Sequence, residues 1–150
     1  MRIQALSVPL MAMVLAVYAT GASADEIAQR KAAMDDINDA AKVLFAMVKN
    51  ERPFDGKDAA RSGYTVLNNL TAAAMLFPEG SVGENSRARP EIWQEMEHFA
   101  EDFEKAKMAA QEIADSGGAN DEGAFRKNVI QLGEACKACH EHFRKPRKET

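Results

Sequence analysis

The chain has 150 residues, of which 46% are hydrophobic and 28% are charged, and its formal net charge is −4. This length suits one domain, and the negative charge argues against nucleic acid and against an anionic membrane surface as partners. Ala, Glu, Lys, Met and Leu are frequent, whereas Gly and Pro gather in a few places. That composition favours an all-α fold.

Residues 1–24 have the features of an export signal. Arg2 supplies the positive charge, an apolar stretch follows, and Ala22-Ser23-Ala24 is a small-residue cleavage site. The apolar stretch is shorter than the roughly 20 residues of a spanning helix, although a retained anchor is the alternative. We expect cleavage before Asp25, no membrane insertion afterwards, and a mature domain of residues 25–150 in the periplasm.

The first two predicted helices each carry one apolar stripe. One runs from about residue 25 to 49, and the other from about residue 58 to 77, where Pro78-Glu79-Gly80 stops it. The stripes are Ile27, Met34, Ile37, Ala41, Leu44, Phe45 and Val48 on the first helix, and Ala60, Tyr64, Leu67, Leu70 and Ala74 on the second.

The last two predicted helices follow a polar loop. Pro90 suits the first position of the third helix, and Gly117-Gly118 ends it. The fourth runs from about residue 121 to 144. Their stripes are Ile92, Trp93, Met96, Phe99, Phe103, Ala110 and Ile113, and Phe125, Val129, Leu132, Cys136, Cys139, His140 and Phe143. Four amphipathic helices with mostly short connections predict an antiparallel up-down-up-down four-helix bundle.

The motif Cys136-Lys137-Ala138-Cys139-His140 contains the only two cysteines of the chain. C-x-x-C-H is the spacing of a covalent haem attachment site, in which the following imidazole becomes the proximal iron ligand. A thioredoxin-like pair would need a βαβ pattern that is missing, and zinc would need further ligands at suitable spacing. The motif predicts one haem c, tethered by Cys136 and Cys139 and ligated by His140.

The bundle topology places this motif at one end of the molecule. Cys136, Cys139 and His140 fall within about 100° of arc on the core stripe, so we expect the haem to be inserted among the helices near that end. Candidate walls of its pocket are Met34, Phe77, Trp93, Met96 and Phe143. Ordinary core packing is the alternative for each of them.

These residues resemble the class II cytochromes c, which include cytochrome c-prime. The resemblance covers essentially the whole mature chain. It rests on Arg30-x-x-x-Met34, on Arg89-Pro90-Glu91-Ile92-Trp93, and on Cys136 to Arg144, with Phe143 where members often have Tyr. It implies a four-helix bundle with one covalent haem near one end.

The resemblance also implies that position 34 faces the distal side of the iron. An apolar residue there, such as Leu, goes with five-coordinate, gas-responsive members, and Met goes with low-spin, six-coordinate members. This chain has Met34, whose soft thioether suits haem iron. We therefore expect Met34 as the distal ligand, with simple packing in the distal pocket as the alternative.

Arg30 lies one turn before Met34. A haem propionate is a suitable bidentate acceptor for its guanidinium, and a solvated arginine at a helix start is the alternative. The resemblance also matches Arg144 to a basic residue on the proximal side. The remaining histidines, His98 and His142, are predicted to be exposed, as is an acidic face of the third helix: Glu95, Glu97, Glu101, Asp102 and Glu104.

The expected function is that of a periplasmic electron carrier without enzymatic activity, with His140 and Met34 as axial ligands. Its expected partners are periplasmic redox proteins, with a homodimer as one arrangement that the resemblance allows. The alternative is a five-coordinate, cytochrome c-prime-like haem protein that binds NO or CO. A haem-free helical bundle is a third hypothesis.

Overall fold

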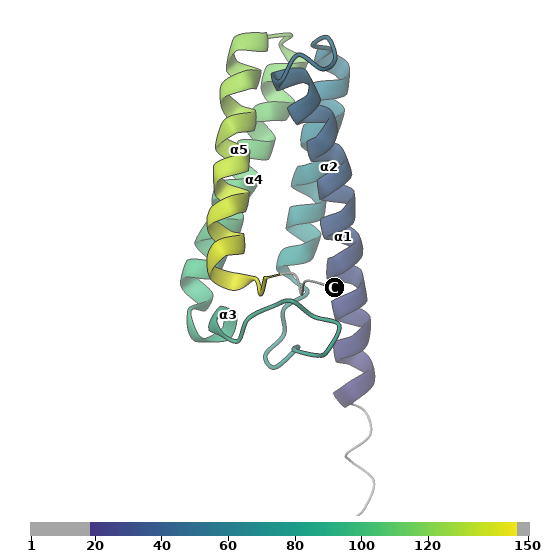
Figure 1. The fold of residues 1–150 in the computed structure, drawn as a ribbon, viewed down its shortest axis with the longest axis vertical. Coiled ribbons are helices and arrows are strands. Elements are labelled where there is room, and N and C mark those ends of the chain that lie inside the picture. The colour runs from purple at the N-terminus through teal and green to yellow at the C-terminus, as the bar shows by residue number, and fades with distance from the viewer. Residues whose placement is uncertain (1–18, 147–150) are drawn as a thin grey trace, which may run out of the picture.

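The computed structural model describes residues 19–146 and contains five helices in this range (Figure 1). They are α1 (Ala19–Val48), α2 (Gly56–Ala74), α3 (Glu91–Gln94), α4 (Met96–Gly118) and α5 (Glu122–Phe143). The four long helices run alternately up and down, and the short α3 lies at the end of the bundle where α5 finishes (Figure 1). The predicted all-α four-helix bundle is confirmed.

Most of the predicted export signal, residues 1–18, lies outside the described part of the chain. The predicted cleavage site, Ala22-Ser23-Ala24, falls in the first turns of α1. The signal at 1–24 and the mature domain at 25–150 therefore stay predictions. Between residues 19 and 146, no helix combines the length and the apolar character that crossing a membrane requires.

The third predicted helix is divided in two at Glu95. This residue has φ −124° and ψ 45°, which lies outside the helical region, and the helical ladder restarts with Phe99 N donating to Glu95 O at 2.9 Å. The short α3 is tied to the preceding loop, because Trp93 Nε1 donates to the carbonyl of Pro78 at 2.9 Å. This contact is distant in sequence, so helical periodicity alone did not indicate the break.

The seam between α2 and α4 is made of small residues. The predicted stripe on α2 was wrong in part: Leu70 is buried and Leu67 packs against the core as expected, but Tyr64 is 48% exposed. The other buried positions of α2 are Gly56, Ala59, Ser62, Gly63, Val66 and Ala73. A β-carbon added at Gly63 would lie 2.7 Å from the backbone N of Ala114 on α4. The backbones of α2 and α4 therefore approach each other more closely than larger side chains permit.

Helices α1 and α5 meet at one end of the bundle and make few contacts elsewhere. At the meeting point, Arg126 near the start of α5 donates to Val48 O at 2.6 Å and to Asn50 Oδ1 at 2.7 Å. Asp121 caps α5 there by accepting from Ala124 N at 3.0 Å. These contacts join the end of α1 to the start of α5 and leave the opposite halves of the two helices apart (Figure 1).

We predict that Gly63→Ala lowers the free energy of unfolding by about 1–3 kcal/mol, because the new methyl group forces α2 and α4 apart. Gly118→Ala is the matched control, since a β-carbon there meets nothing within 4 Å; it should be neutral or stabilising by up to about 1 kcal/mol. Urea denaturation followed by circular dichroism measures both. Equal stability of the two variants would contradict close packing at Gly63.

Candidate functional site

A cavity of about 770 Å³ lies between the separated halves of α1 and α5. Its volume falls within the range of ligand-binding pockets. The apolar walls come from α1, α3, α4, α5 and the loop between α2 and α3: Ile27, Ile37, Phe45, Phe77, Ile92, Phe99, Phe103, Leu132 and Phe143. The helices thus leave a largely apolar cavity at the end of the bundle where α5 finishes.

The α5 wall of the cavity carries the two cysteines and the histidine of the predicted attachment motif. Cys136, Cys139 and His140 line it, and both cysteines are free thiols. Burial raises the pKa of Cys136, and burial followed by the nearby Asp102 and Cys136 raises the pKa of Cys139 to about 12. Both groups are therefore neutral thiols at neutral pH.

His140 is held as a neutral imidazole. Burial lowers its pKa to about 4, and the charges of Arg144 and Arg87 act in the same direction. A histidine must be deprotonated to bind a metal, so the protonated form competes only in strongly acidic solution. His140 is in the protonation state that an iron ligand requires.

Met34 reaches the same cavity from α1, and its side chain is half-buried. The structure thus brings Met34 and His140, which are more than 100 positions apart in the sequence, to one cavity from two different helices. Ligation of iron by Met34 stays a prediction.

Arg30 is 5% exposed and therefore buried, in contrast to a solvated arginine at a helix start. Its Nη1 donates to Leu76 O at 3.2 Å and to Ser81 Oγ at 3.1 Å, and its Nη2 donates to Ser81 O at 2.5 Å and to Ser86 Oγ at 2.9 Å. The guanidinium carbon also lies 4.7 Å from the centre of the Phe77 ring. Arg30 fastens the loop between α2 and α3 beneath the cavity, and its contact with a propionate stays a prediction.

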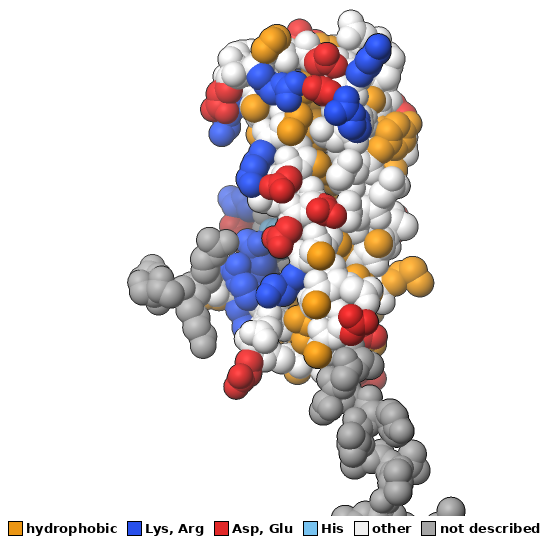
Figure 2. All heavy atoms as spheres, turned by 90° about the vertical axis from the view of Figure 1, so that its right-hand side faces the viewer, with side chains coloured by type: hydrophobic (Ala, Val, Ile, Leu, Met, Phe, Trp, Pro, Cys, Tyr) orange, Lys and Arg blue, Asp and Glu red, His pale blue; other side chains and the backbone are white. Residues whose placement is uncertain are grey.

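Basic side chains border the cavity. Three of them, Lys31, Arg87 and Arg144, line the cavity, and we call them the basic rim. Asp35 is the one acidic side chain among the lining residues of the described chain. Arg87 is oriented by donating from Nε and Nη2 to Lys145 O, at 2.9 and 2.7 Å. Figure 2 shows Lys and Arg side chains gathered in the lower half of the molecule, beside the C-terminal end of the described chain.

This arrangement fits a c-type haem. The two thiols lie one turn apart on one wall, the neutral imidazole of His140 follows directly, and aromatic side chains form the sides. The basic rim supplies cations at which two propionates can be paired. The residues that would hold the group are Cys136 and Cys139 as tethers and His140 as the iron ligand.

Two of the predicted pocket walls were wrong. Phe77 and Phe143 line the cavity as expected, but Trp93 is not among its lining residues and instead holds the loop through its indole N–H. Met96 is 42% exposed, because it is the first residue of α4 and the break at Glu95 places it outside the core register.

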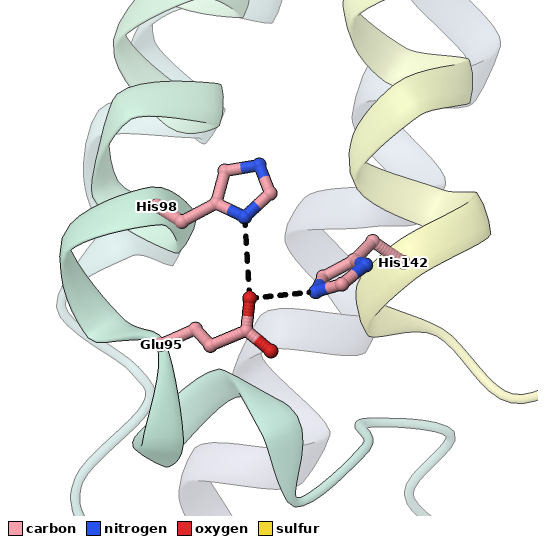
Figure 3. A group of neighbouring side chains, drawn as sticks. All are labelled: Glu95, His98 and His142. Carbon is pink, nitrogen blue, oxygen red and sulfur yellow. Dashed lines mark hydrogen bonds and ion pairs between the residues drawn. The ribbon is translucent and has the colours of Figure 1, made fainter.

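Sequence reasoning missed a polar cluster beside the cavity. Asp102, predicted on an exposed face, is only 5% exposed and accepts from Lys105 Nζ at 3.0 Å. His98 is exposed as predicted, whereas His142 is half-buried, and the Glu95 carboxylate lies between the two imidazoles (Figure 3). The spacing of Glu95 and His98 suggests a pair on one helix, but only the packing of α4 against α5 adds His142.

Comparisons with known proteins agree with this site. A family model described as cytochrome C′ matches residues 25–144. The chain is 35% identical over 124 residues to a cytochrome c′ of Rhodopseudomonas palustris, covering 82% of this chain and 84% of the relative. It is 36% identical over 112 residues to a cytochrome c-554 of Cereibacter sphaeroides, covering 67% and 78%. The crystal structure of cytochrome c′ from Rubrivivax gelatinosus superimposes with a TM-score of 0.77 at 27% identity, covering 82% of this chain and 97% of that one.

We predict that Arg30→Lys lowers the free energy of unfolding by about 1–3 kcal/mol, since an ammonium group cannot span the acceptors on Leu76, Ser81 and Ser86. The reverse exchange at the exposed neighbouring position, Lys31→Arg, serves as control and should stay within about 0.5 kcal/mol of the parent protein. Urea denaturation gives both values. If Arg30→Lys is as stable as the parent, the loop is held by other contacts.

Proposed function

This chain belongs to the cytochrome c′ family, whose members carry one covalently attached haem c, and on that premise we propose that it is a periplasmic haem protein that binds NO or CO. The proposed gas site is on the Met34 side of the iron. The observation that carries the proposal is the apolar cavity between α1 and α5, which bears the attachment motif on one wall and the flexible Met34 on another. Its cytochrome c′ homologues are haem proteins and not classical enzymes.

A bound haem would supply an iron that can take a ligand, and the side chains of the cavity would decide what reaches that iron. His140 would ligate the iron as a neutral imidazole, and Cys136 and Cys139 would attach the group covalently to α5. The aromatic and aliphatic walls of the cavity favour an uncharged diatomic ligand over an ion. The Lys and Arg side chains of the basic rim would donate hydrogen bonds to the propionates at the open edge of the cavity.

Met34 controls access to the distal position in this proposal. Its side chain is unbranched and has three rotatable bonds, and it is half-buried at the cavity wall. A small diatomic ligand needs only a rotamer change of this one side chain, with no displacement of the α1 backbone. Met34 therefore sets how readily the gas binds, whether by occupying the position itself or by filling the space above it.

A second candidate function is single-electron transfer, and the presence of a thioether on the wall opposite the attachment motif favours it. If Met34 stays on the iron in both oxidation states, both axial positions are filled and His/Met ligation raises the reduction potential. In that case we propose periplasmic redox proteins as partners. A homodimer is compatible with either function.

Visible spectra of the oxidised and reduced protein, with and without CO, distinguish the two functions. For a gas-binding protein we expect the reduced spectrum to shift on addition of CO. We expect Met34→Leu to accelerate CO binding by at least about tenfold, because leucine has no thioether that could compete for the iron. For an electron carrier, the oxidised protein shows a methionine–iron charge-transfer band and CO shifts only the Met34→Leu variant.

Met108→Leu is the matched control for this experiment. Met108 is 58% exposed on α4 and does not line the cavity, so its variant should behave as the parent protein. A CO response that is absent from both the parent and Met34→Leu would contradict the proposed gas site. An unchanged CO rate in Met34→Leu would show that the Met34 thioether does not compete for the iron.

We also predict that the chain without haem keeps its helices but loses fixed packing, because α1 and α5 then face a large unfilled cavity. Protein made without the covalent attachment machinery should retain its far-ultraviolet circular dichroism, lose most of its near-ultraviolet signal, and melt over a broad range. A Cys136→Ala, Cys139→Ala double variant should show the same behaviour. A sharp thermal transition in either sample would indicate that the bundle packs without the group.

A further inference from the structure

Glu95, His98 and His142 form a second cluster of ligand-type side chains, separate from the residues that line the cavity (Figure 3). Glu95 stands at the break between α3 and α4, His98 lies in the first turn of α4, and His142 lies in the last turn of α5. Figure 3 shows the Glu95 carboxylate directed between the two imidazoles. The start of α4 therefore contributes two donor groups, and the end of α5 contributes the third.

The spacing of these donor atoms suits a small tetrahedral ion. Glu95 Oε2 lies 2.9 Å from His142 Nε2 and 3.4 Å from His98 Nδ1, and all three ligand atoms lie within 4.8 Å of one another. In a tetrahedral zinc site with bonds of 2.0–2.1 Å, neighbouring ligand atoms are about 3.3 Å apart. Two of the three separations are thus already near the required value, and a side-chain rotation of His98 or His142 closes the third.

A buried carboxylate stands behind one of the imidazoles. His98 directs Nδ1 towards Glu95, and its other ring nitrogen, Nε2, lies 3.7 Å from Oδ2 of Asp102, which is 5% exposed. Ligating histidines characteristically present their second nitrogen to a carboxylate, which fixes the tautomer and the ring orientation. Asp102 is in the position of that supporting group for His98.

Aromatic packing restricts both imidazoles. The His142 ring lies 4.4 Å from the Phe143 ring at 86°, and the His98 ring lies 5.3 Å from the same ring at 68°. Phe143 is 2% exposed and therefore fixed in the core. The donor side chains remain 42–46% exposed on their outer sides, which leaves room for a water molecule as the fourth ligand.

We propose that Glu95, His98 and His142 bind a divalent transition-metal ion of the zinc type, with water in the fourth position. Two imidazoles and one carboxylate select Zn²⁺ and its neighbours over Ca²⁺ and Mg²⁺, which take oxygen ligands. The bound ion ties the α3–α4 break to the end of α5, two residues beyond His140.

The test is a calorimetric titration of the haem-loaded protein, free of any polyhistidine tag, with Zn²⁺ alone. We expect one ion per chain, and at least about tenfold weaker binding in Glu95→Gln and in His142→Gln, each of which removes one of the three protein ligands. Glu97→Gln is the matched control, because it removes the same charge from an exposed position in the first turn of α4, two residues after Glu95. It should bind within about twofold of the parent protein.

A second variant tests the supporting carboxylate. Asp102→Asn should weaken Zn²⁺ binding by about 10–100-fold. Lys105→Met removes the other partner of Asp102 without touching His98, and it should leave Zn²⁺ binding unchanged.

Circular dichroism confirms that the variants remain folded, and an unchanged haem spectrum in all samples places the ion away from the cavity. Absence of stoichiometric binding, or full binding by both Glu95→Gln and His142→Gln, would overturn the site and leave the cluster as a hydrogen-bonded bridge between helices.

Discussion

The separation of α1 from α5 is the constraint on which the rest of the structure depends. Arg126 joins the two helices at one end through Val48 and Asn50, and beyond that point they diverge around the cavity. A four-helix bundle normally closes such a gap with side chains. Here the gap has room for a rigid apolar group, so the packing of α1 against α5 depends on the haem that would fill the space between them.

The other helix pairs compensate for this open pair. Gly63 on α2 lets the backbone of α4 approach closely. Helix α1 packs against α2 and helix α5 packs against α4, so this tightly packed pair supports both helices that border the cavity. Arg30 closes the lower side by holding the loop between α2 and α3 through Ser81 and Ser86. A buried guanidinium is stable only when its donors are satisfied, so the loop fixes Arg30 as much as Arg30 fixes the loop.

The end of α5 presents two histidines to different surroundings. His140 and His142 are two positions apart, which is about 200° around a helix; His140 faces the cavity, and His142 faces Glu95 and α4. The break at Glu95 makes this second environment, because it frees a carboxylate at the level of the last turn of α5. Any ligand at His142 therefore acts on the segment that also carries the haem attachment.

The local chemistry was predictable from the sequence, and the contacts across the bundle were not. The C-x-x-C-H spacing, the helical periodicity and the Gly and Pro stops are properties of neighbouring residues, so they indicated the haem, the four long helices and most of their ends. The buried face of α2 was misjudged because Gly and Ala give a weak hydrophobic signal. The partners of Arg30 lie 46 to 56 positions away, and Asp102 and His142 acquire their surroundings only where α4 meets α5. Polar side chains find their partners in three dimensions, and this is why only the tertiary structure decided which of them are buried, paired or brought together.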